Sequence, residues 1–266
     1  MSQPLQGRVA IVTGAGQGVG LSIARLLFER GANVMFADAD EAVLKAGTSD
    51  YDSSAGRVRR FAGQMAERLA MANLLSATLD AFDRIDILVN AHRLVQQSDP
   101  LDTDPASLDN MLHQNLMAGL RLSQMVAKRM IRQVGDSPDP AGAGAIVSVS
   151  PAARQLPSML DYSIACAAQR QAVRGLALAL APHRIRVNGV AFASVMSHEL
   201  KSVLRTTPAL RDRVLAGTPL GRIAAPDELA ETVLYLAGDG ARFVTGQIIT
   251  VDGGRGLTDP VGGPLS

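Results

Sequence analysis

A glycine-rich turn between a strand and a helix is the feature that most limits what this chain can fold into. The strand candidate Val9–Thr13 runs directly into Gly14-Ala15-Gly16-Gln17-Gly18-Val19-Gly20, and Val19–Arg30 follows with helical periodicity. Glycines permit positive φ and let a ligand approach the backbone, while the first helical turn offers free N–H groups to a phosphate. A tight turn also needs glycine, so it is the order of strand, turn and helix that favours dinucleotide binding.

An acidic residue follows the turn at a suitable distance. Asp38 comes directly after the strand candidate Asn33–Ala37 and lies 18 residues beyond Gly20. An acid about 20 residues past such a turn accepts hydrogen bonds from ribose hydroxyls and repels a 2′-phosphate. The sequence therefore predicts NAD as the cofactor, preferred over NADP. Asp38 could also be a helix N-cap, because Glu41 follows three residues later, and the two roles are compatible.

The rest of the chain alternates short apolar runs with amphipathic stretches. This alternation predicts an α/β fold, a doubly wound Rossmann-type domain whose seven-stranded, mostly parallel sheet carries helices on both faces. A length of 266 residues with 47% hydrophobic residues favours a single domain over 1–266. The further strand candidates are Val58–Ala62, Ile85–Val89, Ala145–Val149, Ile185–Val190 and Gln247–Val251, and the further helices are Glu67–Phe82, Ala106–Val134 and Tyr162–Leu180.

One long stretch, Ala193–Pro226, lacks strand character. In this architecture it would lie beyond the carboxyl ends of the strands, where ligands bind. We expect it to cover the substrate, although a plain surface excursion would have the same pattern. Its apolar residues suggest a hydrophobic ligand: Val195, Met196, Leu200, Val203 and Leu204.

Charge and composition argue against several classes of protein. A net charge of +1 gives no electrostatic footprint for nucleic acid or for an acidic membrane surface. A single cysteine allows no internal disulfide, and the four histidines have no metal-ligand spacing. No apolar run reaches the length of a membrane span, and the first residues lack the pattern of a signal peptide. We therefore expect a cytoplasmic protein without a metal.

Several motifs together resemble the short-chain dehydrogenase/reductase family over essentially the whole chain. The turn matches the cofactor motif TGxxxGxG of that family, and ILVNAHR resembles its ILVNNAG segment. The sixth and seventh strand candidates match almost residue for residue. These segments are Thr13–Gly20, Ile87–Arg93, Ala145–Ser150, Arg184–Ala191 and Thr245–Gly254.

The resemblance implies hydride transfer between a nicotinamide and a small-molecule carbonyl or alcohol. It places Tyr162 as the catalytic acid or base, Ser150 as the catalytic serine and Asn115 as the catalytic asparagine. It also implies association through the two long helices, as a dimer or homotetramer. Besides the turn, Asp38 and Tyr162, the cofactor contacts that it implies are Gln64, Met65, Asn90, Ala91, His92, Val195 and Ser197.

The chain departs from the family at the position of the catalytic lysine. Four residues after Tyr162, where the family has a lysine that lowers the pKa of the tyrosine and holds the nicotinamide ribose, this chain has Cys166. Arg154, in a loop, and Arg170, about 12 Å of helical rise from Tyr162, are the cations that could substitute. Cys166 itself is either a reactive thiol or a small buried residue packed near the cofactor.

Further departures leave two functions open. Ser150 stands 12 residues before Tyr162, whereas the family serine usually stands 13 before, so it could be a turn residue ahead of Pro151. His92, Arg93 and Phe192 are bulkier than the family residues beside the cofactor. The protein is therefore either an NAD-dependent oxidoreductase with weakened or altered catalysis, or a catalytically silent NAD-binding homologue that forms a hetero-oligomer with an active paralogue.

Overall fold

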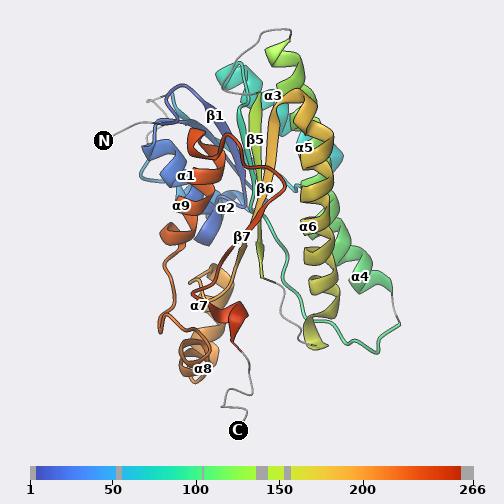
Figure 1. The fold of residues 1–266 in the computed structure, drawn as a ribbon, viewed down its shortest axis with the longest axis vertical. Helices are drawn as coiled ribbons and strands as arrows, with labels where there is room; N and C mark the ends of the chain where they lie inside the picture. The colour runs from blue at the N-terminus through green and yellow to red at the C-terminus, as the bar shows by residue number, and fades with distance from the viewer. Residues whose placement is uncertain (1–3, 52–55, 104, 136–142, 153–156, 259–266) are drawn as a thin grey trace.

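The computed structural model describes residues 4–51, 56–103, 105–135, 143–152 and 157–258. Its centre is a seven-stranded sheet in which every paired strand runs parallel to its neighbour, in the order β3-β2-β1-β4-β5-β6-β7 (Figure 1). The predicted Rossmann-type sheet is therefore confirmed. Its strands are β1 (Val9–Thr13), β2 (Asn33–Asp38), β3 (Val58–Ala62), β4 (Ile87–Asn90), β5 (Gly144–Pro151), β6 (Ile185–Phe192) and β7 (Ile248–Val251).

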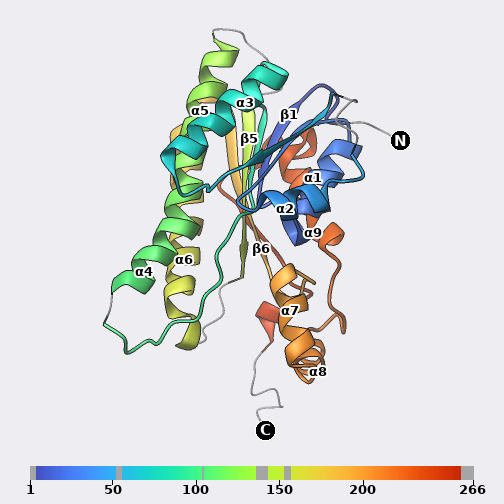
Figure 2. The same cartoon turned by 180° about the vertical axis from the view of Figure 1, so that it is seen from behind.

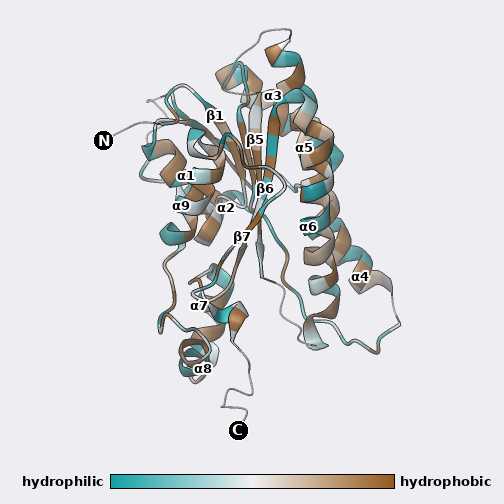
Figure 3. Cartoon of the chain, in the orientation of Figure 1, coloured by the Kyte–Doolittle hydropathy of each residue, from teal (hydrophilic) through white to brown (hydrophobic). Residues whose placement is uncertain are grey.

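Helices cover both faces of the sheet, as the views from the front and from behind show (Figures 1 and 2). On one face α1 (Gly18–Glu29) and α9 (Pro226–Ala237) pack over the apolar residues of β1, β4 and β5. On the other face α3 (Arg68–Phe82), α5 (Ala118–Val134) and α6 (Leu160–Leu180) close a second core. Colouring by hydropathy places the apolar residues of the strands between these two layers (Figure 3).

The order of the strands fixes where a ligand can bind. From β1 the chain winds outward to β2 and β3, and it then returns to place β4 on the other side of β1. The connections after β1 and β4 therefore diverge and leave a crevice at the carboxyl ends of these strands, which is where open parallel sheets bind ligands. Thr13 and Asn90 are the last paired residues beside this crevice.

The predicted helix over Ala106–Val134 is interrupted. The structure has α4 (Pro105–Leu112), a π-helical turn at His113–Met117 and then α5. A π-turn shifts the register by one residue without ending the helix, so apolar periodicity alone does not reveal it. Two shorter helices, α2 (Glu41–Gly47) and the outer helix α9, were also not predicted.

The stretch 193–226 contains two helices, α7 (His198–Thr206) and α8 (Leu210–Ala216), beyond the carboxyl end of β6 (Figure 1). Its two ends are joined, because Val195 and Ala224 form a parallel β-bridge and the N–H of Ala224 donates to the carbonyl of Ser194. The segment is thus a closed excursion that leaves and rejoins the fold at one point. Within the described ranges no helix is long and apolar enough to cross a membrane.

Candidate active site

The glycine-rich turn is packed too closely for side chains at its key positions. A Cβ on Gly20 would lie 2.0 Å from the carbonyl oxygen of Gly14, and Gly14 and Gly18 both have positive φ, 66° and 56°. Asp38 fixes the turn from β2, since the N–H of Gly16 donates to its carboxylate at 2.9 Å. The alternative role of Asp38 as an N-cap is wrong, because Asp40 accepts the hydrogen bond from Val43 at the start of α2.

A pocket of about 310 Å³, here named the turn pocket, opens between this turn and the end of β4. Glycine N–H groups, the start of α1 and one acid at the end of β2 fit the adenosine diphosphate half of a nicotinamide dinucleotide. The predicted cofactor contacts that line it are Gly14, Gln17, Gly18, Val19, Gly20, Asp38, Gln64, Met65, Ala91 and His92.

His92 forms the floor of the turn pocket as a neutral group. Its Nδ1 lies 2.9 Å from the hydroxyl of Thr13. The backbone of His92 lies against Gly14, where a Cβ would come within 2.8 Å of its Cα. Burial lowers the pKa of His92 to about 4, so the imidazole is uncharged at neutral pH.

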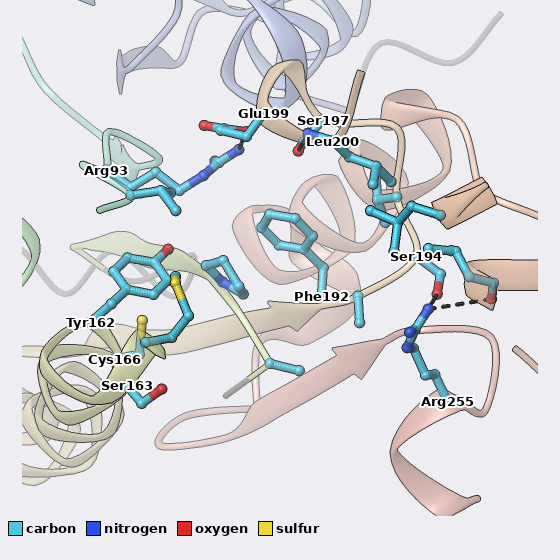
Figure 4. Close-up of a pocket in the computed structure, with 18 residues that line it drawn as sticks. Arg93, Tyr162, Ser163, Cys166, Phe192, Ser194, Ser197, Glu199, Leu200 and Arg255 are labelled. Atoms are coloured by element: carbon cyan, nitrogen blue, oxygen red, sulfur yellow. Dashed lines mark hydrogen bonds and ion pairs between the residues drawn. The ribbon is translucent and has the colours of Figure 1, made fainter. Parts of the chain in front are cut away.

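A second cavity of about 250 Å³, here named the tyrosine cavity, lies where α6, the end of β6 and α7 meet (Figure 4). Its surface is mostly apolar, and Tyr162 and Cys166 form one wall of it. The predicted residues Val195 and Ser197 also line it; Ser197 additionally caps α7 by accepting a hydrogen bond from the N–H of Leu200. Tyr162, Val195 and Ser197 are therefore brought together, beside the turn pocket.

Tyr162 and Cys166 are both buried and both protonated at neutral pH. Burial, with the adjacent Cys166 thiol as the next cause, raises the pKa of Tyr162 far above its usual value. Burial likewise raises the pKa of the Cys166 thiol. Within the described part of the chain the Tyr162 hydroxyl has no oxygen or nitrogen partner, and only the weakly hydrogen-bonding Cys166 thiol lies beside it. A buried hydroxyl with so weak a partner is costly unless a ligand satisfies it.

An ion pair that the sequence did not reveal separates the two cavities. Arg93, after β4, donates to the carboxylate of Glu199 on α7 at 2.6 Å, and both residues line both cavities. The Arg93 guanidinium also lies 5.2 Å from the ring centre of Phe192. The sequence indicated that Arg93 and Phe192 are bulky for this position, but nothing in it pointed to Glu199, 106 residues further on.

The other predicted catalytic residues lie outside the tyrosine cavity. Ser150 is on the α6 side of β5, where it lines a very small cavity with Gln169 and Arg170. Asn115, in the π-turn, accepts from the N–H of Leu94 at 2.9 Å and donates to its carbonyl at 3.0 Å. The side chain of Asn115 therefore fixes the loop that carries Arg93.

Two more of the predicted residues, Asn90 and Arg170, line neither the turn pocket nor the tyrosine cavity. Asn90 is buried at the end of β4 and donates to the hydroxyl of Ser123 at 2.9 Å, away from the turn pocket. Arg170 lies near enough to Cys166 to lower the pKa of the thiol, but it does not line the tyrosine cavity. Arg154 lies outside the described residues. Among those described, no group of histidine, cysteine and acidic side chains could hold a metal ion.

Comparison with known proteins identifies the family. The family profile described as "Enoyl-(Acyl carrier protein) reductase" matches residues 14–255. The 7alpha-hydroxysteroid dehydrogenase of Escherichia coli (strain K12) is 29% identical over 252 residues, which is 94% of this chain and 94% of that protein.

Solved structures agree with this match. A 7 alpha-hydroxysteroid dehydrogenase complexed with NADH and 7-oxo glycochenodeoxycholic acid has a TM-score of 0.86 at 29% identity, covering 95% of this chain and 96% of that one. A gluconate 5-dehydrogenase from Burkholderia cenocepacia J2315 in complex with NADP and tartrate has a TM-score of 0.85 at 27% identity, covering 97% and 98%. The chain belongs to the short-chain dehydrogenase/reductase family of oxidoreductases, whose members bind nicotinamide dinucleotides.

Proposed function

We propose that this protein is an NAD(H)-dependent oxidoreductase that interconverts a hydroxyl and a carbonyl group on an apolar small molecule. The observation that carries the proposal is the buried hydroxyl of Tyr162, which has no oxygen or nitrogen partner and lies at an apolar cavity that adjoins the turn pocket. In this proposal the whole chain is one dinucleotide-binding domain, and the segment 193–226 covers the substrate. The name of the hydroxysteroid relative supports an apolar substrate class.

Each cavity has its own task in the reaction. The turn pocket would hold the adenosine half of NAD, with the Asp38 carboxylate on the ribose hydroxyls and against a 2′-phosphate. When bound, the nicotinamide would give or take a hydride. Tyr162 would donate a proton to a carbonyl oxygen of the substrate, or remove one from its hydroxyl.

Turnover should be slow, because the residue at the family's lysine position is Cys166. Loss of one positioned electrostatic group typically lowers the rate by about 10² to 10³. Burial keeps Tyr162 protonated at neutral pH. The hydroxyl is therefore better suited to donate a proton during reduction than to remove one during oxidation.

A second function is favoured by one observation. The Arg93–Glu199 ion pair lies between the two cavities, across the route that an extended dinucleotide would take, and Phe192 lies beside Arg93 in the tyrosine cavity. If these side chains exclude the nicotinamide half of the dinucleotide, the protein would be a catalytically silent homologue that acts in an oligomer with an active paralogue. Either function allows the association through the long helices that the sequence predicted.

Nucleotide binding and turnover together test these functions. We expect NADH to bind more tightly than NADPH when nicotinamide fluorescence is followed, with little protein background because the chain has no tryptophan. NADH oxidation should then be screened with apolar ketones. Tyr162→Phe should abolish turnover and keep NADH binding. Turnover that survives in this variant would contradict the role of Tyr162, and NADH binding without turnover of any ketone would favour the silent homologue.

A further inference from the structure

We propose that Arg93 is the positioning cation of this site: it presents a positive charge to the Tyr162 hydroxyl from the opposite wall of the tyrosine cavity, and Glu199 sets how much of that charge the hydroxyl experiences. The proposal rests on the role proposed above for Tyr162. It supplies from the loop after β4 a charge that Cys166 does not supply from α6.

Arg93 is held firmly enough for this role. Its side chain is only 10% exposed, and its guanidinium pairs with Glu199 at 2.6 Å and lies over the ring of Phe192. The next residue, Leu94, is bonded at both its N–H and its carbonyl by Asn115. Burying a guanidinium costs free energy unless it is paired. A surface arginine would avoid this cost, so the burial of Arg93 beside the tyrosine cavity points to a role in the site.

The direction of Arg93 relative to Tyr162 supports the role. Both side chains line the tyrosine cavity, and the Tyr162 hydroxyl is directed toward the wall that carries Arg93 (Figure 4). The charge of Arg93 lowers the pKa of Tyr162 against the larger effect of burial.

Among the residues that the structure describes, the other groups around Tyr162 provide no comparable charge. On its own helix Cys166 is a protonated thiol, and Met111 packs against it from α4. Glu199, on α7, is negative and raises the pKa of Tyr162. Arg255 lies at another part of the cavity, where it donates to the hydroxyl of Ser194. Arg93 and Glu199 therefore act on Tyr162 in opposite directions.

Spectrophotometric titration tests the proposal without turnover. The chain has three tyrosines and no tryptophan, so the tyrosinate absorbance that Tyr162→Phe removes belongs to Tyr162. Arg93→Gln should move this absorbance to higher pH and Glu199→Gln to lower pH, each changing the tyrosinate population at a fixed pH by on the order of tenfold. Arg93→Lys, which keeps a positive charge, should restore most of the effect.

Controls separate this effect from general loss of structure. Arg30→Gln removes an ion pair with Glu231 that lines neither cavity, so it should not move the tyrosinate signal. Circular dichroism at each pH establishes that every variant is folded. The proposal is overturned if Glu199→Gln shows no more tyrosinate than Arg93→Gln at the highest pH at which both variants are folded.

The pH profile of reduction provides a second readout. Arg93→Gln should lower kcat by on the order of tenfold to a hundredfold with a smaller change in KM, and Arg93→Lys should recover it. If the wild-type protein shows no turnover, the proposed oxidoreductase function fails, whereas the titration still decides whether Arg93 acts on Tyr162. If the protein turns over but the Tyr162 titration is unchanged in Arg93→Gln, the proposed role of Arg93 is rejected and the proposed oxidoreductase function is not.

Discussion

Asp38 is the single residue on which the expected choice of nucleotide depends. Its carboxylate is bonded to the N–H of Gly16 and faces the turn pocket, where it would repel a 2′-phosphate. Asp38→Asn keeps an acceptor for Gly16 but removes the charge. We expect the affinity for NADPH to rise by roughly tenfold while NADH binding changes less, measured by fluorescence titration.

Asp40→Asn is the matched control for this prediction. Asp40 caps α2 and does not line the turn pocket, and asparagine is an equally good N-cap. Equal gains in NADPH affinity for the two variants would show that net charge, and not the position of Asp38, decides the preference.

A substitution at Cys166 should raise the low rate of turnover that we expect for this protein. Its thiol is buried in the wall of the tyrosine cavity, one helical turn from Tyr162. Cys166→Lys should raise kcat for reduction of an apolar ketone by on the order of tenfold. The gain should be larger in an Arg93→Gln background, because the two cations would otherwise repel each other.

Cys166→Met is the uncharged control for length and should give no gain. If Cys166→Lys is folded and binds NADH but turns over no faster than Cys166→Met, a missing cation is not what limits the rate.

At the scale of the elements, much of the fold could be predicted because the physical signals are local. Both β1 and β3 have the predicted bounds. The strand β1 is a buried, continuous run of apolar and β-branched residues, whereas β3 is an edge strand in which buried and more exposed residues alternate. The signal for α9 was also present, with Pro226 at its first turn and Leu229 and Val233 on one face, although it was not recognised.

The site was less predictable, because its decisive contacts join distant parts of the chain. Glu199 meets Arg93 only after α7 has been placed against the loop that follows β4. Asn115 is bonded to the backbone of Leu94 because a π-turn redirects it, and the π-turn leaves no mark in the apolar periodicity. The sequence indicates candidate residues by their type, whereas the residues that they contact are known only once the fold is known.

The junction of β1 and α1 can be tested through its glycine. Gly20→Ala would place a methyl group 2.0 Å from the carbonyl oxygen of Gly14, so the helix must move away from the turn. We expect a loss of about 3 kcal/mol in the free energy of unfolding together with loss of NADH binding, measured by urea denaturation and fluorescence titration.

Gly175→Ala is the matched control within α6. A Cβ there meets nothing within 4 Å, so the same substitution should stabilise the protein by about 0.5–1 kcal/mol and leave NADH binding unchanged. Similar losses in both variants would mean that the close approach at Gly20 is not what the turn requires.

At the scale of the whole molecule, the crevice at the switch between β1 and β4 couples the stability of the fold to the site. Thr13, Gly14 and His92 bring the ends of these two strands into contact, and Gly14 and His92 also line the turn pocket. The floor of the ligand site is thus part of the contact that holds the centre of the sheet. A ligand that binds only the folded protein should therefore raise its unfolding midpoint.

The pH dependence of unfolding tests this coupling through His92. Burial lowers its pKa to about 4, against about 6.5 in the unfolded chain. As the pH falls below 6.5 the unfolded chain binds a proton that the folded protein does not, so stability decreases toward acid until the folded pKa is reached. The full difference amounts to about 3 kcal/mol. Urea denaturation at pH 7.0 and pH 4.5 should therefore show a larger acid loss in the wild type than in His92→Gln, whose side chain does not titrate and can still bond to Thr13. If the two proteins lose the same stability, the imidazole binds its proton as readily in the folded protein as in the unfolded chain, and His92 would then present a cation to the turn pocket at pH 4.5.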